Sequence, residues 1–295
     1  MTQLIDSKRK HHAHESRPAF DGGVTDSEGL RRPIVTEKRQ RSRRATVSLR
    51  VTVPLLLFAL WWILTSTGVI AATTLSSPAA TWDAFVNLLL HQNLLGDIGI
   101  SAARAAAGLA IGASLGLVLG ITTGLFRLGE ELLDSSLQML RTVPFPAVIF
   151  LFIIWYGIGE TAKVALIALA TLFPMYLTTS NGVRNVDRKV VEAARTFGLV
   201  GQRLVRKVII PLAMPSIMTG LRYSTGVSII ALVFAETIAA NQGIGYLVSQ
   251  ASSLLQTPNL VVCIIVYALL GIAADLAVRT LEKYTMPWRR HLAVR

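Results

Sequence analysis

The stretch from Glu192 to Pro211 reads EAARTFGLVGQRLVRKVIIP and lies between two long apolar runs. These runs cover Lys163–Gly182 and roughly Ser216–Ala240, and each is about as long as the 20 residues that a helix needs to cross a bilayer. The stretch between them is long enough for two short helices. Its basic residues, with one just upstream, are Lys189, Arg195, Arg203, Arg206 and Lys207. The pattern indicates a membrane protein that presents a basic segment to water.

The composition of the whole chain agrees with this interpretation. Of the 295 residues, 52% are hydrophobic and 16% are charged, whereas soluble proteins carry about 25% charged residues. The net charge is +12, and residues 1–50 supply +6 of it, from twelve Lys or Arg and six Asp or Glu. An excess of Lys and Arg is typical of the cytoplasmic side of membrane proteins, and we favour that explanation over nucleic-acid binding. A single cysteine, Cys263, excludes a disulfide framework, and we predict no metal site.

Apolar runs predict an all-α integral membrane protein with six transmembrane helices. The chain divides into a basic tail at 1–48, which we expect to be disordered, and a membrane domain at 49–295. The third run is short and is expected to extend at its start. The six predicted spans are Val51–Ala72, Ile98–Phe126, Val143–Tyr156, Lys163–Gly182, Ser216–Ala240 and Leu260–Leu281.

The connections between these spans alternate in charge. Those with Lys or Arg are the N-terminal tail, 127–142, 183–215 and the C-terminal end, and those without are 73–97, 157–162 and 241–259. Loops rich in Lys and Arg stay in the cytoplasm. The alternation therefore predicts six spans, with both termini and the 192–211 segment on the cytoplasmic side.

Ionisable residues and a proline inside the spans are candidates for a transport pathway or gate. Arg104 and Glu236 lie near the outer halves of the second and fifth spans, and intramembrane charges are usually functional. Arg104 could attract an anionic solute, extend to the outer headgroups, or pair with Glu236. We expect Glu236 to be a structural anchor near the outer gate. Pro174 bends the fourth span, which is common where a path runs through a helical bundle.

The second span also has glycine at every fourth position. Such a row lies along one helix face and lets another helix approach closely. The seam could slide during transport or could be a static packing contact. Its members are Gly108, Gly112, Gly116, Gly120 and Gly124.

The basic segment itself has the sequence of a helical hairpin. Asp187 is a good N-cap for a helix over 188–197, and Gly198 suits the left-handed position that ends it. A second helix is predicted from about Val200 to Val208, and Pro211 is expected to end it before the fifth span.

One face of this hairpin is predicted to fit another protein. Glu192 projects a carboxylate, and the small side chains of Ala193 and Ala194 leave a low surface beside it. No lysine follows a glycine, so the chain lacks a G-K-[ST] phosphate-binding loop, and no nucleophile–base arrangement is visible. We therefore expect no catalytic residues, and any ATP chemistry must come from a partner.

At these residues the sequence resembles the EAA-motif permeases of ABC importers. Glu192-Ala193-Ala194, Gly198 and Val208-x-Ile210-Pro211 match the EAA–G–I-x-L-P pattern, with conservative changes at the Ile and Leu positions. The resemblance extends from about Ile100 to Leu281. Further stretches resemble the subfamily that imports sulfonates, taurine and nitrate, with the aliphatic sulfonate permeases most similar. They are Leu137–Pro144, Trp155–Glu160, Thr171–Pro174 and Ala235–Ala240.

The resemblance implies a type I importer fold and a set of partners. Two copies of the chain would form a homodimer in the bacterial inner membrane, served by two cytoplasmic ATPase subunits and an external solute-binding protein. ATP and Mg would be bound by the ATPases, with no cofactor in this chain. By analogy, a coupling segment at about 184–211 would dock on the ATPase through Glu192, Ala193 and Ala194, with Gly198 and Pro211 shaping it.

The sequence leaves the solute open. Aliphatic sulfonate is the first choice, and taurine, nitrate, bicarbonate or another small solute is the alternative. An ion-coupled secondary transporter that uses Arg104 and Glu236 is a competing hypothesis, but it has no need for a partner-shaped hairpin.

Overall fold

Long helices account for most of the structure. The structure is a computed structural model that describes residues 43–126, 139 and 143–287, and every regular element in those residues is helical. The chain divides after Leu56 into two compact units. Helix α1, Arg43–Ser66, crosses this division, and the first unit contains only its N-terminal part among the described residues. Residues 1–42 of the predicted disordered tail lie outside the described residues, and 43–48 are helical.

Among the described residues of the second unit, four helices are long and apolar enough to cross a membrane. They have 25 to 32 residues, which corresponds to about 37 to 48 Å at 1.5 Å per residue. The hydrocarbon core of a bilayer is only about 30 Å thick. These helices are α3 Leu94–Leu125, α7 Glu160–Arg184, α10 Ile210–Ala239 and α12 Thr257–Thr285. They correspond to the second, fourth, fifth and sixth predicted spans.

The first and third predicted spans correspond to shorter apolar helices. The apolar part of α1 covers Thr52–Ser66, and α6 covers Phe145–Tyr156. With 12 residues, α6 is about 18 Å long, so the described part of the third span cannot cross the bilayer alone. Gly157, with φ of +77°, ends this helix. The expected extension of the span at its start falls on 127–142, where only Met139 is described.

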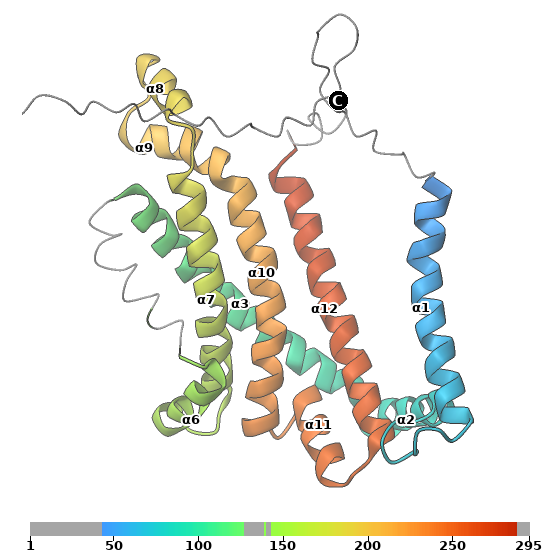
Figure 1. Ribbon diagram of the computed structural model, residues 1–295. Helices are drawn as coiled ribbons and strands as arrows, with labels where there is room; N and C mark the ends of the chain where they lie inside the picture. The colour runs from blue at the N-terminus through green and yellow to red at the C-terminus, as the bar shows by residue number, and fades with distance from the viewer. Residues whose placement is uncertain (1–42, 127–138, 140–142, 288–295) are drawn as a thin grey trace, which may run out of the picture. The chain divides into compact units, whose positions relative to one another are not determined.

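Two helices lie in connections for which the sequence predicted no structure. Helix α2, Pro78–His91, begins after Ser77, whose Oγ accepts a hydrogen bond from the Ala80 N–H at 3.2 Å. Helix α11, Ile244–Ser253, fills much of the connection before α12. Figure 1 shows α6 and α11 at one end of the bundle and the helices α8 and α9 at the other. Helix α8 is Arg188–Thr196 and α9 is Gly201–Leu204.

The glycine row of α3 lies directly against α7. A Cβ on Gly112 would collide with the backbone carbonyl of Ala168 and with Oγ1 of Thr171. A Cβ on Gly120 would come within 2.7 Å of the Thr179 Cβ. The absent side chains therefore let the two backbones approach, as small residues do in membrane helices. The packing seam is therefore present between α3 and α7. That it slides during transport remains a prediction.

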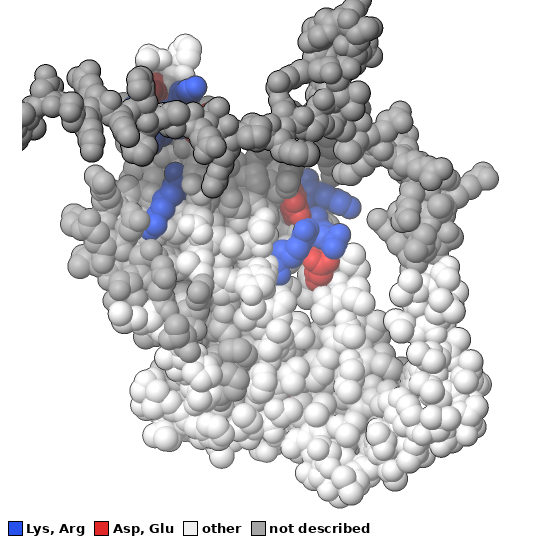
Figure 2. Space-filling view, in the orientation of Figure 1, with Lys and Arg blue, Asp and Glu red and all other residues white. Residues whose placement is uncertain are grey.

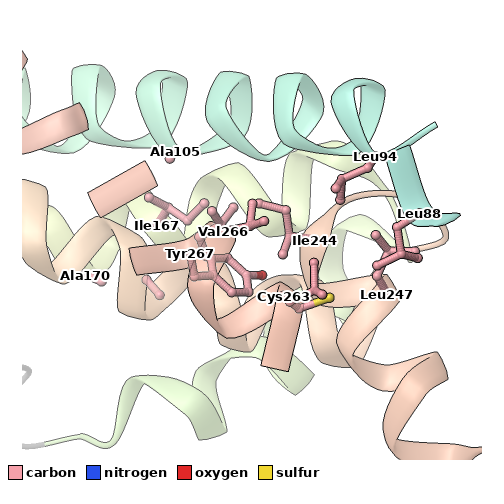
Figure 3. Packing of buried hydrophobic residues seen from close by; sticks show 13 residues of the cluster. Leu88, Leu94, Ala105, Ile167, Ala170, Ile244, Leu247, Cys263, Val266 and Tyr267 are labelled. Atoms are coloured by element: carbon pink, nitrogen blue, oxygen red, sulfur yellow. The ribbon is translucent and has the colours of Figure 1, made fainter. Parts of the chain in front are cut away.

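The main apolar core joins α2, α3, α7, α10, α11 and α12. Figure 3 shows Ile167, Val266 and Tyr267 gathered beneath Ala105 of α3, with Cys263 in the same cluster. Cys263 is a free thiol and is fully buried. In the view of Figure 2, the charged side chains gather toward the end of the bundle that carries α8 and α9. No Lys, Arg, Asp or Glu is visible among the described residues at the opposite end in this view.

Candidate functional site

The predicted hairpin begins with a capped helix. The Asp187 carboxylate accepts a hydrogen bond from the Lys189 N–H at 2.9 Å, and α8 follows from Arg188. This contact satisfies one of the backbone donors that are left free at the start of a helix. The Asp187 N-cap predicted from the sequence is therefore confirmed.

A glycine ends α8 in the way that the sequence predicts. Gly198 has φ of +78°, in the left-handed region that favours glycine. The Gly198 N–H donates to the Arg195 carbonyl at 2.9 Å, and the Leu199 N–H donates to the Ala194 carbonyl at 3.1 Å. These two bonds form a Schellman motif, which turns the chain sharply toward α9.

The second helix of the hairpin does not end at Pro211, so that prediction is wrong. Helix α9, a π-helical turn at Val205–Ile209 and α10 run on without a break from Gly201 to Ala239. The Ile210 N–H donates to the Val205 carbonyl, five residues back. The π-helical turn interrupts the regular hydrogen bonds of the helix just before Pro211. The backbone N–H that Pro211 lacks is therefore missing where the regular pattern is already broken, and the helix continues.

The exposed face of the hairpin differs from the predicted one at two places. Glu192 and Ala193 are exposed as predicted, but Ala194 is buried, with 9% of its surface accessible. Ala194 lies on the inner side of the hairpin and does not contribute to a surface beside Glu192. Phe197 and Val200 are 86% and 64% exposed, and sequence analysis did not single them out. Their signal was available, since both are apolar residues beside the helix-ending Gly198.

A second candidate site is a buried charge cluster centred on Glu236. Its side chain is fully buried in α10, yet it is surrounded by hydrogen-bond donors. The carboxylate accepts from the Ser101 hydroxyl at 2.8 Å, from Nη1 of Arg104 at 2.7 Å and from the Gly245 N–H at 2.9 Å. The Tyr267 hydroxyl also donates to it, at 3.1 Å. Since these donors come from α3, α11 and α12, the carboxylate ties three helices to α10.

The turn between α10 and α11 lies close to this carboxylate because of two glycines. Gly243 has φ of +109°, and a Cβ there would come within 2.5 Å of Glu236 Oε1. A Cβ on Gly245 would collide with the Glu236 side chain. The Gly243 N–H donates to Asp97 at 2.6 Å, and the Ile244 N–H donates to the Ser101 hydroxyl at 2.9 Å. The turn is therefore fixed to α3 as well as to Glu236.

Arg104 is paired on both sides. Nε and Nη2 each donate to the Glu160 carboxylate at 2.6 Å, and Nη1 donates to Glu236 and, at 2.7 Å, to the Gln242 carbonyl. Lys163 donates to the same Glu160 at 2.8 Å. Of the three interpretations of Arg104, the structure contains the pair with Glu236. Sequence analysis missed the roles of Glu160 and Lys163, although their spacing of three at the start of a span was a usable signal.

The third pathway candidate, Pro174, lies elsewhere. It is buried in α7 and lines an apolar groove of about 630 Å³ with Phe173, Trp155 and Tyr223. Arg104 and Glu236 do not line this groove. The structure therefore brings Arg104 and Glu236 together but leaves Pro174 apart from them. Within the described residues, no group of His, Cys, Asp and Glu is placed to hold a metal ion.

Comparison with known proteins places these features in a family. Residues 112–286 match the model of the binding-protein-dependent transport system inner membrane component. The chain is 48% identical over 235 residues to the Escherichia coli putative aliphatic sulfonates transport permease protein, covering 80% of this chain and 89% of that protein. It is 41% identical to the Bacillus subtilis protein of the same description, covering 80% and 86%.

A solved structure has the same fold. The structure of an amino acid ABC transporter superposes with a TM-score of 0.54 at 18% identity, covering 68% of this chain and 98% of that one. The matched family is the transmembrane component and not an ATPase, and it gives no reason to expect a cofactor in this chain. The chain therefore belongs to the inner membrane components of binding-protein-dependent transport systems: it is a multi-pass permease subunit of an ABC importer, which works with a separate ATPase and a solute-binding protein.

Proposed function

We propose that this permease imports aliphatic sulfonates across the bacterial inner membrane. The choice of substrate rests on the 48% identity, over four-fifths of the chain, to a protein described as an aliphatic sulfonates permease. The chain works as a homodimer, each copy spanning the membrane six times through the domain at 49–295. Both termini and the hairpin lie in the cytoplasm, which the alternation of basic connections supports.

The hairpin over 184–211 couples the permease to its ATPase. Glu192 and Ala193 are exposed at its surface, and the Schellman turn at Gly198 holds α8 and α9 in a compact unit. Closure of the ATPase pair on ATP moves this unit as a rigid body. The continuous helix from Gly201 to Ala239 supports this proposal, because displacement of the hairpin is passed directly into a membrane-spanning helix.

The Glu236 cluster closes the outer end of the permease. Because Glu236 binds donors on three other helices, separation of those helices breaks several charge-assisted hydrogen bonds together. We assign Arg104 and Glu236 to this gate and Pro174 to the apolar groove between α6, α7 and α10.

Uptake by the reconstituted importer tests the substrate. The permease, its ATPase and its binding protein are placed in proteoliposomes, and ATP-dependent uptake is measured for ethanesulfonate, hexanesulfonate, taurine, nitrate and bicarbonate. The proposal expects uptake of the two alkanesulfonates well above the other solutes. Preferred uptake of taurine or an inorganic anion would replace the substrate, and uptake driven by an ion gradient without ATP would contradict the mechanism.

A further inference from the structure

An exposed carboxylate sits on two buried cations at the start of α7. The side chains of Arg104 and Lys163 are each 5% exposed, whereas that of Glu160 is 62% exposed. Nε and Nη2 of Arg104 and Nζ of Lys163 donate to the Glu160 carboxylate at 2.6, 2.6 and 2.8 Å. Two cations that the protein has buried are therefore covered by one anionic group that reaches into solvent.

These three donors have the geometry of an oxoanion receptor. The Nε–Nη2 edge of an arginine binds two oxygens of a carboxylate, phosphate or similar group side by side. A sulfonate carries three oxygens, so two can take the arginine edge and the third can accept from Lys163. In the structure the carboxylate of Glu160, the first residue of α7, occupies this place with its two oxygens.

Arg104 is also held from its other side. Its Nη1 donates to the buried Glu236 and to the Gln242 carbonyl, each at 2.7 Å. The free edge would therefore stay aimed at the position that the Glu160 carboxylate occupies. Because Arg104 is already fixed in place, little conformational entropy is lost when an anion from outside binds.

An apolar groove begins at the same residue. A groove of about 560 Å³ is lined by Glu160 and, beyond it, by apolar side chains of three helices. Ile111 and Leu115 come from α3, Phe152 from α6, and Val164 and Leu172 from α7. Glu160 is the member of the charge cluster that lines this groove, so a chain of methylene groups that extends from an anion in the place of its carboxylate can be buried there. Burial of apolar surface favours such binding.

We propose that Arg104 and Lys163 form a site for an oxoanion that carries an alkyl tail, and that Glu160 occupies this site until such a ligand displaces it. Alkanesulfonates from outside have this chemistry, and so do anionic phospholipids of the bilayer. The sulfonate as occupant rests on the proposed function, whereas the site itself rests on the geometry alone.

Binding measurements on the intact importer test the site. The full-length chain with its ATPase is placed in phosphatidylcholine nanodiscs, and 1-hexanesulfonate binding is measured by calorimetry against empty nanodiscs. Glu160→Gln is expected to lower the Kd for hexanesulfonate about tenfold, because the neutral amide no longer competes for Arg104 and Lys163 with charge-assisted hydrogen bonds. Adding Lys163→Gln is expected to reverse the gain. Glu282→Gln, which alters a partly buried acidic residue of α12 that pairs with Arg222 outside this cluster, is the matched control and should change nothing.

Three results separate the possible explanations. If Glu160→Gln leaves hexanesulfonate binding unchanged, or if neutral 1-hexanol gains as much as the sulfonate, the site is refuted. If phosphatidylglycerol nanodiscs abolish the gain, the occupant is the anionic lipid, and if they do not, it is the sulfonate. Uptake tests the proposed function separately. If binding responds to these variants but the importer transports no sulfonate, the proposed substrate is refuted and the binding site is not.

Discussion

Replacing Glu236 by glutamine should destabilise the protein strongly. The carboxylate is fully buried, and Ser101, Arg104, Gly245 and Tyr267 all donate to it. Glutamine keeps the shape but puts an NH₂ group where one oxygen was. At least one donor would then face another donor, and the Arg104 charge would lose its buried partner.

The magnitude follows from these contacts. Removing one partner of a buried ion pair costs about 3–5 kcal/mol. Arg104 retains Glu160 and the Gln242 carbonyl, so we expect the lower end, about 3 kcal/mol. Tyr267→Phe removes only the donor at 3.1 Å and should cost about 1 kcal/mol. Asp275→Asn, at a partly exposed residue that pairs with Arg279 and Arg222 near the surface, should cost no more than about 1 kcal/mol.

The assay is equilibrium unfolding of the purified permease in bicelles, followed by tryptophan fluorescence. The expected order of destabilisation is Glu236→Gln, then Tyr267→Phe, then Asp275→Asn. If Glu236→Gln and Asp275→Asn lower the free energy of unfolding by the same amount, the cluster does not hold α10 to its neighbours, and the reasoning fails.

Three further predictions concern the hairpin, the glycine seam and one strained turn. Glu192→Arg and Gly198→Val should each leave the protein in the membrane while uptake falls at least about tenfold and ATP hydrolysis continues; ATP-driven uptake that survives both would contradict the docking role. Gly112→Leu should destabilise the α3–α7 contact by about 1–3 kcal/mol, whereas Gly271→Leu, where a Cβ meets nothing within 4 Å, should be tolerated; equal unfolding free energies would refute the seam. Replacing Leu255, which is 86% exposed with φ of +55°, by glycine should raise the free energy of unfolding by about 1 kcal/mol, and a loss of stability would refute the strain at this turn.

Local signals predicted the hairpin well except at its second helix. The N-cap at Asp187 and the turn at Gly198 depend on a few neighbouring residues, and both are present as predicted. The prediction for Pro211 was wrong because a proline ends a helix only where a regular hydrogen bond would be needed. The π-helical turn before it removed that requirement, and such a turn has no clear sequence signal.

Hydropathy located the apolar helices but not the two short helices in the connections. It located α3, α7, α10 and α12 because a membrane helix must be apolar along its full length. It gave no signal for α2 and α11, which are short helices in the connections. The small side chains beside Glu192 predicted that Ala194 belongs to the docking surface, whereas the fold of the hairpin buries that residue.

The sequence by itself determined the membrane class, the basic segment and its family motif, because each is written in the order and hydropathy of neighbouring residues. Only the tertiary structure decided what the charges do. Glu160, Arg104 and Glu236 are far apart along the chain. The glycines of α3 let it pack closely on α7, which brings Arg104 to Glu160, and the packing of α10 against α3 brings Glu236 to Arg104. A buried charge needs partners, and the identity of those partners depends on which helices pack together.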